Sequence, residues 1–347
     1  MLILAINPGA TSIKAAIFQD EQELTRSVVR FDTDVLQSFS TYQKQSDYRL
    51  SMIAEFLAHE GYESSDFDCV VSRGGPLKAV SSGAYHINEQ MLKDAEEART
   101  PQTQGIQVAY SMMHPLGKPC LIYDAVSADE WEPVAKVTGL KGCRKKALQH
   151  TLNARRVAIE TAEKLGKPLN ETNLLVAHIG GGTDVIFFRK GRIIETIGYN
   201  DFGFSPERCG ALPFDETVEL MKKMSYEELR ALNRGKGGLV SYFGTADIQK
   251  IEGMIDAGDQ EAELVLRAMI YRIAQTIGAG AVSLHGDVDA VILTGGGAYS
   301  ERICGWITEA VAFIAPVYRV PGEMEMKALA MGALRVMRGE ETAKEYQ

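Results

Sequence analysis

Residues 2–18 of this chain read LILAINPGATSIKAAIF. Two apolar runs flank a Pro-Gly turn, a pattern that predicts two β-strands of a hairpin. The first strand ends in Asn7, and the turn from Pro8 to Ser12 contains small and hydroxyl residues, with Lys14 soon after it. Both an ordinary hairpin and a phosphate-facing turn fit this stretch when it is taken alone.

A second stretch repeats this pattern about half a chain later. Residues 173–196, NLLVAHIGGGTDVIFFRKGRIIET, again predict a strand, a glycine turn, a strand, a turn and a strand. When residues 9–11 are laid over residues 181–183, the two hairpins match in polarity along their length. Although hairpins resemble one another in general, a repeat at this separation favours an internal duplication and two domains of one fold.

Length and composition agree with a two-domain globular protein. The composition, with 45% hydrophobic and 24% charged residues, is normal for a globular protein. The length of 347 residues is too great for one ordinary core and suggests about two domains. The formal net charge of −9 argues against a general nucleic-acid binder, which needs a basic surface.

The cysteines and the amino-terminal segment indicate a cytoplasmic location. Five cysteines, an odd number without a Cys-x-x-Cys pair, are typical of reduced thiols in the cytosol. The first residues lack the basic segment of a signal peptide. No stretch reaches the ~18–20 apolar residues of a membrane-spanning helix.

Elsewhere in the chain strands alternate with helices, which predicts the α/β class with mixed sheets. We expect strands in residues 67–75, 118–127, 287–295 and 315–321. Helices are expected in residues 48–61, 87–99, 105–117, 301–314 and 324–339. A long basic amphipathic helix is expected over residues 141–166, which places His150 inside a helix.

Glycine turns follow three of the predicted apolar strands. They lie at Pro8-Gly9 and at two triplets, Gly180, Gly181, Gly182 and Gly295, Gly296, Gly297. Glycine lets backbone N–H groups approach an anion without an intervening Cβ. None of these turns fits the P-loop or the dinucleotide fingerprint, so the set predicts a nucleotide held between two domains by another arrangement.

Polar side chains stand at the ends of several predicted strands: Asn7, Arg73, Asp124 and His178. Asn7 and Asp124 carry oxygen ligands that Mg²⁺ accepts, and the fork of Arg73 suits a carboxylate or a phosphate. Each residue alone fits a structural role, and the set is what indicates a site.

Two further basic residues stand in unusual contexts. Arg208 lies in the loop FGFSPERCGALP, where it either pairs with Glu207 or serves a site, and His150 lies among several arginines and lysines. The spacing of histidine, cysteine and acidic residues matches no zinc site, and no G-x-S-x-G indicates a serine hydrolase.

These motifs resemble butyrate kinases, in the acetate and propionate kinase group of the superfamily of sugar kinases, heat-shock chaperones and actin. The resemblance runs nearly end to end. It rests on INPGATSIKAAIF, VSRGGPLK, HIGGGTDV, GGLVSYFGTADIQKIE, VDAVILTGGGAYS and RGEE, and most specifically on SPERCGALP and PGEMEM…ALAMGALRV.

The resemblance implies duplicated ribonuclease-H-like domains, as in actin-like ATPases, with ATP and Mg²⁺ in an interdomain cleft. We expect residues 1–150 and 151–326 to form the two domains, with the last helix, about 327–347, packing back on the first. It also implies a homodimer or larger homo-oligomer, a short-chain carboxylic acid as substrate, and neither nucleic acid nor membrane as partner.

The resemblance also implies residue roles. Arg73, His150, Arg208 and Asp124 correspond to catalytic residues. Asn7, Asp124 and Glu325 correspond to residues that organise Mg²⁺, with Glu323 as the alternative to Glu325. The triplets 180–182 and 295–297, with Asp247, correspond to the nucleotide site.

The chain departs from the family pattern in two places. The family has a second histidine in the segment that reads ARTPQTQG here, where Thr100 takes its place, and the turn reads PGATSIK instead of the more usual PGSTSTK.

The residues after Arg73 bear on the length of the acyl chain. After the counterpart of Arg73, acetate kinases carry two valines, whereas this chain has Gly74 and Gly75. The loss of these side chains predicts room for a longer acyl chain, such as butyrate or a branched acid.

Two alternatives remain open on this reading. One is a kinase of the same fold that acts on acetate, propionate or another small molecule. The other is a non-catalytic, nucleotide-gated binding protein like the actin members.

Overall fold

A computed structural model describes residues 1–9, 12–31, 35, 38–198, 200–201 and 203–347. Ala10 and Thr11 of the first turn lie outside the described residues. Within the described part of the chain, no helix is both long enough and apolar enough to span a membrane.

The chain divides into two compact units. Unit 1 comprises residues 1–130, 146–156 and 324–347, and unit 2 comprises residues 131–145 and 157–323. Helix α5, Thr151–Lys164, crosses the division between residues 156 and 157. The domain limits expected from the sequence, at residues 150 and 326, stay a prediction.

Unit 1 is built on a mixed sheet with the strand order β12-β5-β6-β4-β1-β2-β3. Its strands are β1 (Leu2–Pro8), β2 (Ser12–Gln19), β3 (Gln22–Arg30), β4 (Cys69–Arg73), β5 (Ala84–His86), β6 (Cys120–Tyr123) and β12 (Lys344–Glu345). Its helices are α2 (Tyr42–Glu60), α3 (Glu89–Ala98), α4 (Gln104–Met113) and α12 (Glu325–Met337), with short 3-10 turns η1 (Ser64–Asp66) and η2 (His114–Leu116). The hairpin predicted from residues 2–18 is the antiparallel pair of β1 and β2.

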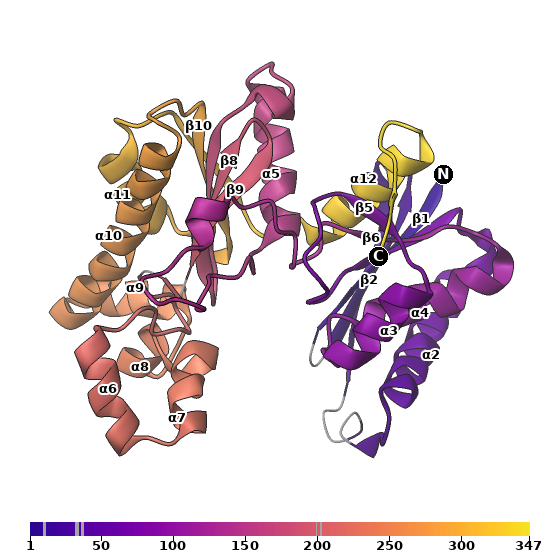
Figure 1. Cartoon of the computed structure of the whole chain (residues 1–347), viewed down its shortest axis with the longest axis horizontal. Coiled ribbons are helices and arrows are strands. Elements are labelled where there is room, and N and C mark those ends of the chain that lie inside the picture. Colours follow the sequence, from indigo (N-terminus) through magenta and orange to yellow (C-terminus); the bar gives the residue numbers. More distant parts are fainter. Residues whose placement is uncertain (10–11, 32–34, 36–37, 199, 202) are drawn as a thin grey trace. The chain divides into compact units, whose positions relative to one another are not determined.

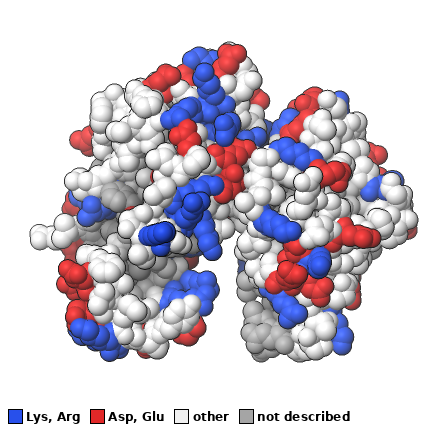
Figure 2. Space-filling model, viewed as in Figure 1, with Lys and Arg blue, Asp and Glu red and all other residues white. Residues whose placement is uncertain are grey.

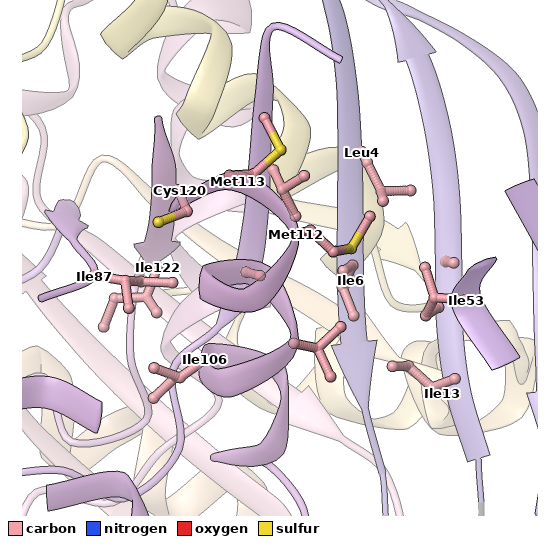
Figure 3. Close-up of a cluster of buried hydrophobic side chains, with 14 of the residues drawn as sticks. Leu4, Ile6, Ile13, Ile53, Ile87, Ile106, Met112, Met113, Cys120 and Ile122 are labelled. Atoms are coloured by element: carbon pink, nitrogen blue, oxygen red, sulfur yellow. The ribbon is translucent and has the colours of Figure 1, made fainter. Parts of the chain in front are cut away.

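Successive side chains of β1 point to opposite faces of this sheet, and both faces are covered by helices. Leu4, Ile6 and Ile13 point into a core with α2, α3 and α4. Figure 3 shows Ile13 near Ile53 and Ile6 near Met112 in this core. Ile3 and Ala5, one residue out of step, pack against α12 on the other face. Because strand side chains alternate between faces, the continuous apolar run of β1 is the signature of a strand buried on both sides.

Unit 2 repeats the arrangement with the strand order β11-β10-β7-β8-β9. Its strands are β7 (Leu174–Ile179), β8 (Thr183–Arg189), β9 (Arg192–Gly198), β10 (Ala290–Gly295) and β11 (Val317–Pro321). Its helices are α6 (Phe214–Lys223), α7 (Tyr226–Ala231), α8 (Leu239–Phe243), α9 (Ile248–Asp256), α10 (Gln260–Ser283) and α11 (Glu301–Val311). The short turns are η3 (Pro133–Lys136), η4 (Leu169–Glu171), η5 (Leu232–Lys236) and η6 (Gly296–Tyr299). Figure 1 shows α10 and α11 side by side along the sheet.

Close packing in unit 2 depends on one glycine of α10. A Cβ on Gly280 would lie 2.5 Å from Leu175 Cδ2 and 2.8 Å from Phe187 Cε1. The helix backbone therefore rests directly on the side chains of β7 and β8. Leu175 and Phe187 pair with each other at the end of this hairpin away from the glycine turn of residues 180–182.

The long helix expected over residues 141–166 is wrong in its first part. Helix α5 begins at Thr151, so His150 stands immediately before it. Residues 144–145 pair instead with residues 136–137: Arg144 bridges Val137, and the Lys145 amide donates to the Lys136 carbonyl at 3.1 Å. The Lys145 ammonium lies 3.5 Å from carboxylate oxygens of Glu195 and Asp201. These partners stabilise an extended segment that helical periodicity alone does not reveal.

Charged side chains are interspersed over the face drawn in Figure 2, with basic and acidic groups close to one another. The expectation that the protein is not a general nucleic-acid binder rests on the net charge of −9 and stays a prediction.

Candidate functional site

Three of the predicted site residues of unit 1 meet in one cluster. Arg73 Nη1 donates to Glu325 Oε1 at 3.0 Å, and Asn7 Nδ2 donates to Glu325 Oε2 at 2.5 Å. Both ends of the Glu325 carboxylate are thus held by N–H donors. All three side chains are buried or nearly so.

The sheet explains why these residues come together. Strands β1 and β4 are parallel neighbours with Ile6 opposite Ser72, so Asn7 and Arg73, each the next residue, stand at the same end of the sheet. Glu325 is the first residue of α12, which packs on β1 and β4. A carboxylate in the first turn of a helix is favoured by the helix dipole.

The electrostatics of Glu325 show how strongly cations dominate this cluster. Burial raises the pKa of the Glu325 carboxyl, but attraction to Arg73, Lys14 and His150 and the hydrogen bond from Asn7 bring it below its ordinary value. Glu325 is therefore ionised at neutral pH. The same interactions show that the side chains of Lys14 and His150 lie close enough to act on this site.

His150 reaches the cluster from the start of α5. Its carbonyl accepts a hydrogen bond from the Ala154 amide at 3.0 Å, and the Asn153 side chain accepts one from the Met324 amide at 2.9 Å. The second contact ties the first turn of α5 to the residue before Glu325. His150 thus precedes a helix instead of lying within one, and still lies beside the cluster.

Asp124 takes part in a different set of contacts. Its Oδ1 accepts from the Gly83 amide at 2.8 Å and lies 3.0 Å from Arg155 Nε. Burial raises the pKa of Asp124, and the charge of Arg155 opposes this effect. With 2% of the residue exposed, Asp124 is a buried partner of Arg155.

The glycine pair after Arg73 does not leave open space. A Cβ on Gly74 would lie 2.9 Å from Ile122 Cδ1, and a Cβ on Gly75 would lie 2.3 Å from Thr103 Cγ2 and 3.2 Å from Thr100 Oγ1. The volume that the missing side chains leave is therefore filled by residues 100, 103 and 122. The inference that these glycines widen an acyl pocket is not supported by the packing.

In unit 2 the loop that contains Arg208 is fastened to the β7–β8 glycine turn. Ser205 Oγ donates to the Gly181 carbonyl at 2.6 Å, and the Glu207 amide donates to the same oxygen at 3.1 Å. A Cβ on Gly182 would lie 2.9 Å from Arg208 Nε, so the guanidinium group rests directly on the turn. Glycine at this position is required by the close approach of Arg208.

A cavity of about 380 Å³ opens beside this turn. It is lined by two glycine turns and by α9, with residues Gly180, Gly181, Pro206, Glu207, Ala246, Asp247, Ile248, Gln249, Glu252, Gly296, Gly297, Tyr299 and Ser300. The cavity therefore brings together most of the residues that were predicted to hold a nucleotide. Gly182 and Gly295 support its turns without lining it.

Both predicted glycine triplets are shaped by close contacts. Gly295 has φ of +84°, and a Cβ there would lie 2.5 Å from the Ile179 carbonyl. Its amide and carbonyl pair with those of Gly322 at 3.2 and 2.9 Å. The turn after β10 is thereby held against the end of β7, where the other triplet begins.

Asp247 has a structural function in this cavity. Its Oδ1 accepts from the amides of Gln249 and Lys250, which makes it the N-cap of α9. Across the cavity lining, Ser300 Oγ donates to Glu252 Oε1 at 2.6 Å. Ser300 and Glu252 were missed by the sequence analysis, although Ser300 is recognisable as an N-cap before α11.

A larger cavity of about 660 Å³ lies elsewhere in unit 2. It is mainly apolar and is lined by Phe204, Leu212, Leu232 and Tyr242 among others. The glycine triplets do not line it.

The donor set in unit 1 is compatible with Mg²⁺ only in part. Asn7 and Glu325 offer oxygens at one place, and Mg²⁺ commonly takes one or two protein ligands together with water and phosphate oxygens. Asp124 is held by Gly83 and Arg155 in a separate set of contacts and does not belong to this donor set. Among the described residues, no three histidine, cysteine or acidic side chains form a group that could hold a metal.

Comparison with known proteins places this geometry in a family. Residues 136–315 match the model of the acetokinase family. The chain is 40% identical over 350 residues to the probable butyrate kinase 2 of Caldanaerobacter subterraneus subsp. tengcongensis, and the match covers 99% of each chain.

Solved structures confirm the predicted fold class. The acetate kinase of Porphyromonas gingivalis matches with a TM-score of 0.81 at 18% identity, over 97% of this chain and 99% of that one. The propionate kinase of Francisella tularensis subsp. tularensis matches with a TM-score of 0.76 at 17% identity, over 95% and 98%. The chain therefore belongs to the acetokinase family, as its sequence motifs had indicated.

Proposed function

We propose that this protein transfers the terminal phosphoryl group of ATP to the carboxylate of a short-chain fatty acid, giving an acyl phosphate and ADP, in a reversible reaction. The observation that carries the proposal is the cluster of Asn7, Arg73 and Glu325 in a chain 40% identical to a probable butyrate kinase. The glycine-lined cavity of unit 2 supports the nucleotide half of the reaction.

The chemistry requires little from a general base. A carboxylate is already ionised at neutral pH, so one of its oxygens attacks the γ-phosphorus directly. The new P–O bond forms as the bond to the β-phosphate oxygen breaks, and ADP leaves with that electron pair. Catalysis then depends on in-line positioning and on positive charge around the transferred group.

Arg73 is proposed to orient the substrate carboxylate. Its Nη1 is engaged by Glu325, whereas its buried Nε has no hydrogen-bond partner among the described residues. A buried N–H without a partner is costly, which supports an anionic ligand for this donor. Glu325 would keep the guanidinium group in place while the substrate binds.

Arg208 and His150 are proposed to stabilise the equatorial oxygens of the transferred phosphoryl group. The contact of Arg208 with Gly182 supports this role, because the guanidinium group lies on the glycine turn. His150 supports it by lying close enough to Glu325 to lower the pKa of that carboxyl. Donors fixed before the reaction stabilise developing charge without the cost of reorganisation.

The nucleotide is assigned to the cavity of unit 2, with Gly180–Gly182 and Gly295–Gly297 at its phosphates and Asp247 near its nucleoside. Mg²⁺, which neutralises charge on the phosphates when bound, would be held by Asn7 and Glu325. Asp124 is proposed to act through Arg155, by fixing the first turn of α5, instead of by direct coordination.

Butyrate or a branched acid is the substrate that we propose within this class. The identity to a probable butyrate kinase supports it, whereas the Gly74-Gly75 packing does not. Acetate and propionate, named for the structural relatives, are the competing substrates.

Formation of acyl hydroxamates tests the whole proposal. The purified protein is incubated with ATP, Mg²⁺, hydroxylamine and one acid at a time, from acetate to valerate and including isobutyrate. We expect hydroxamate with the short-chain acids and the highest kcat/KM with a four-carbon acid. A maximum at acetate would reject the choice of butyrate, and no product with any acid would reject the proposed function.

A further inference from the structure

The segment RGEE, residues 338–341, is a motif of the sequence that the proposed mechanism does not use. Helix α12 ends at Met337, and Gly339 turns the chain with φ of +74°. The Glu341 amide donates back to the Arg335 carbonyl at 3.2 Å, and Arg335 Nε donates to Glu341 Oε2 at 3.3 Å. The chain after α12 therefore folds back and pairs an acid with a base of the last helical turn.

Tyr123, at the end of β6, lies between these two charged groups. Its hydroxyl donates to Glu341 Oε2 at 2.9 Å and accepts from Arg335 Nη2 at 2.5 Å. Burial raises the pKa of the Tyr123 phenol, so the hydroxyl keeps its proton at neutral pH. A Cβ on Gly332 would lie 2.4 Å from Tyr123 Cδ2, so α12 rests directly on the ring. Tyr123 is thus joined to the carboxyl-terminal segment by its ring and by its hydroxyl.

The other carboxylate oxygen of Glu341 binds the start of β5. Glu341 Oε1 accepts from the Ala84 amide at 3.1 Å, and Ala84 stands opposite Tyr123 in the antiparallel pair of β5 and β6. Gly83 has φ of +108°, and a Cβ there would lie 2.7 Å from Glu341 Oε1. Glycine at this position admits the carboxylate, which bridges the ends of two neighbouring strands.

These strand ends in turn hold Asp124. The Asp124 amide donates to the Gly83 carbonyl at 3.1 Å, and Asp124 Oδ1 accepts from the Gly83 amide at 2.8 Å. Asp124 has φ of +46°, a conformation that a residue other than glycine keeps only where its surroundings enforce it. The contacts that Glu341 makes with β5 and β6 are part of that enforcement.

Arg155, in the first part of α5, is engaged by both residues at this strand end. Its Nε donates to Asp124 Oδ2 at 3.1 Å. Burial lowers the pKa of Arg155, but the charge of Asp124 and a hydrogen bond with Tyr123 bring it above its ordinary value. A buried network of two acids, two arginines and one phenol therefore connects the carboxyl-terminal segment to α5.

We propose that Tyr123 and Glu341 are positioning residues for His150. They hold Arg155, and with it the first turn of α5, at the end of β6. The His150 carbonyl accepts from the Ala154 amide at 3.0 Å, so His150 is joined to the turn that Arg155 follows. The inference rests on the proposed function, in which His150 stabilises the transferred phosphoryl group.

Removal of one hydroxyl tests this coupling without disturbing the packing. Tyr123→Phe keeps the ring on Gly332 and should lower kcat by about tenfold, the order of one hydrogen bond to a charged group. KM for ATP should stay within about twofold of the wild-type value, because the lost interaction acts in the transition state and the nucleotide cavity lies in unit 2. Glu341→Gln should lower kcat by a similar factor.

The double variant separates a shared role from two independent losses. Both residues act through Arg155, so Tyr123→Phe combined with Glu341→Gln should lower kcat by about tenfold, as each does alone. Independent effects would multiply to about a hundredfold.

A second measurement reports on His150 without catalysis. The full-length protein is labelled with ¹³C at histidine Cε1, and the NMR resonance of His150 is assigned by its absence in His150→Gln. We expect Tyr123→Phe and Glu341→Gln to shift this resonance and to leave those of the exposed His59 and His114 in place. A loss of stability that left the start of α5 in position would not produce this shift.

Two control variants make matched changes outside the network. Tyr85→Phe also removes a buried phenol, which accepts from the Ser81 amide at 3.1 Å, but Tyr85 packs in the core on the other face of the same sheet. Glu340→Gln neutralises the exposed acid next to Glu341. Both controls should keep wild-type kcat and the wild-type His150 resonance.

The outcomes separate this proposal from the proposed function. The proposal is overturned if Tyr123→Phe or Glu341→Gln leaves kcat or the His150 resonance unchanged, if the double variant shows the product of the two losses, or if a control shows the same changes. Should one variant fail to fold, the other must give both changes by itself. Should the wild-type protein phosphorylate no acid, the proposed function fails, and the His150 resonance alone decides whether the network positions this side chain.

Discussion

The hairpins that begin the two sheets share one backbone plan and differ in their chemistry. In unit 1, β1, β2 and β3 are antiparallel and β4 runs parallel beside β1. In unit 2, β7, β8 and β9 are antiparallel and β10 runs parallel beside β7. A bulge falls at Ile17/Phe18 in one hairpin and at Phe187/Phe188 in the other, which supports the internal duplication.

The bulge makes the two hairpins comparable residue by residue. Three positions from it towards the turn, Asn7 pairs with Lys14 in unit 1 and His178 pairs with Asp184 in unit 2. Gly9 is the described residue that follows β1 in unit 1, and the three glycines 180–182 follow β7 in unit 2. Unit 1 thus gathers cations around a carboxylate, and unit 2 exposes bare backbone to a cavity.

This difference suggests how a duplicated fold can divide one reaction. A turn of glycines suits a polyphosphate, which needs backbone N–H groups and no side chains in the way. A strand end with arginine, lysine and histidine suits a substrate whose charge must be oriented and balanced. We infer that the two copies have specialised, one for the nucleotide and one for the acceptor.

The largest expected effect is on the arginine that rests on the unit 2 turn. Arg208→Ala should lower kcat by about 10²–10³-fold, because it removes one preorganised donor to the transition state. The measurement is kcat with butyrate in the hydroxamate assay. Arg230→Ala, on the exposed part of α7, is the control and should keep wild-type kcat; full turnover by Arg208→Ala would remove it from the mechanism.

Glu325→Gln tests the charge balance on the unit 1 side. Loss of the carboxylate leaves Arg73 without its ion pair, and breaking a buried pair costs about 3–5 kcal/mol. Thermal or urea unfolding at pH 7 should show a marked loss of stability. The exposed Glu340→Gln in the same carboxyl-terminal segment should show none.

The dependence of the unfolding free energy on pH gives a second test of the Glu325 carboxylate. The folded pKa of Glu325 lies below its ordinary value of 4.5, so its stabilisation is complete above about pH 4.5 and is lost as pH falls through the folded pKa. The difference in unfolding free energy between wild type and Glu325→Gln should therefore shrink in acid. A difference that stayed constant from pH 7 to pH 3 would show that this carboxyl is not the group held ionised by Arg73.

Two glycines in helices, Gly105 of α4 and Gly278 of α10, give a test with a smaller expected effect, of how closely α4 packs on β1 and β4. Alanine normally stabilises a helix by about 1 kcal/mol relative to glycine. A Cβ on Gly105 would lie 2.0 Å from Ser72 Oγ and 2.9 Å from Pro8 Cγ, whereas a Cβ on Gly278 would meet nothing within 4 Å. Gly105→Ala should lose about 1–3 kcal/mol by overpacking, and Gly278→Ala should gain stability.

Urea unfolding of both variants measures this contrast. Adding Ser72→Ala to Gly105→Ala removes the nearest colliding atom and should restore part of the loss, while the contact with Pro8 persists. Equal effects of the two glycine substitutions would contradict the close approach of α4 to the β1–β2 turn.

The parts that the sequence predicted are those with local signals. Alternating and continuous apolar runs located the strands, and glycine after a strand located the turns. Gly61, for example, ends α2 with φ of +83°, as its place after the apolar pattern predicted. The repeat of the hairpin needed only comparison of two segments of one chain.

The parts that the sequence could not give depend on contacts between distant segments. Residue spacing alone does not bring Glu325 to Arg73, because a helix and a strand 252 positions apart must first pack together. Likewise, the pairing of Asp124 with Arg155 and the filling of space at Gly75 by Thr103 arise only from tertiary packing. Resemblance to a family assigned Glu325 and Arg73 to one site, but predicted neither the pairing of Asp124 with Arg155 nor the filled space at Gly75.

The smallest expected effect separates two functions of Asp247 in the nucleotide cavity. Its carboxylate caps α9 and also lines the cavity, so Asp247→Ala would confound a lost cap, worth about 1 kcal/mol, with a lost ligand contact. Asp247→Ser keeps a capping oxygen and removes the charge. If the carboxylate contacts the nucleoside, Asp247→Ser should raise KM for ATP several-fold, about 1 kcal/mol for one hydrogen bond, with kcat and Tm near wild type. An unchanged KM in Asp247→Ser, with a lower Tm in Asp247→Ala, would leave this residue with the cap alone and move nucleoside recognition to the Ser300–Glu252 side of the cavity.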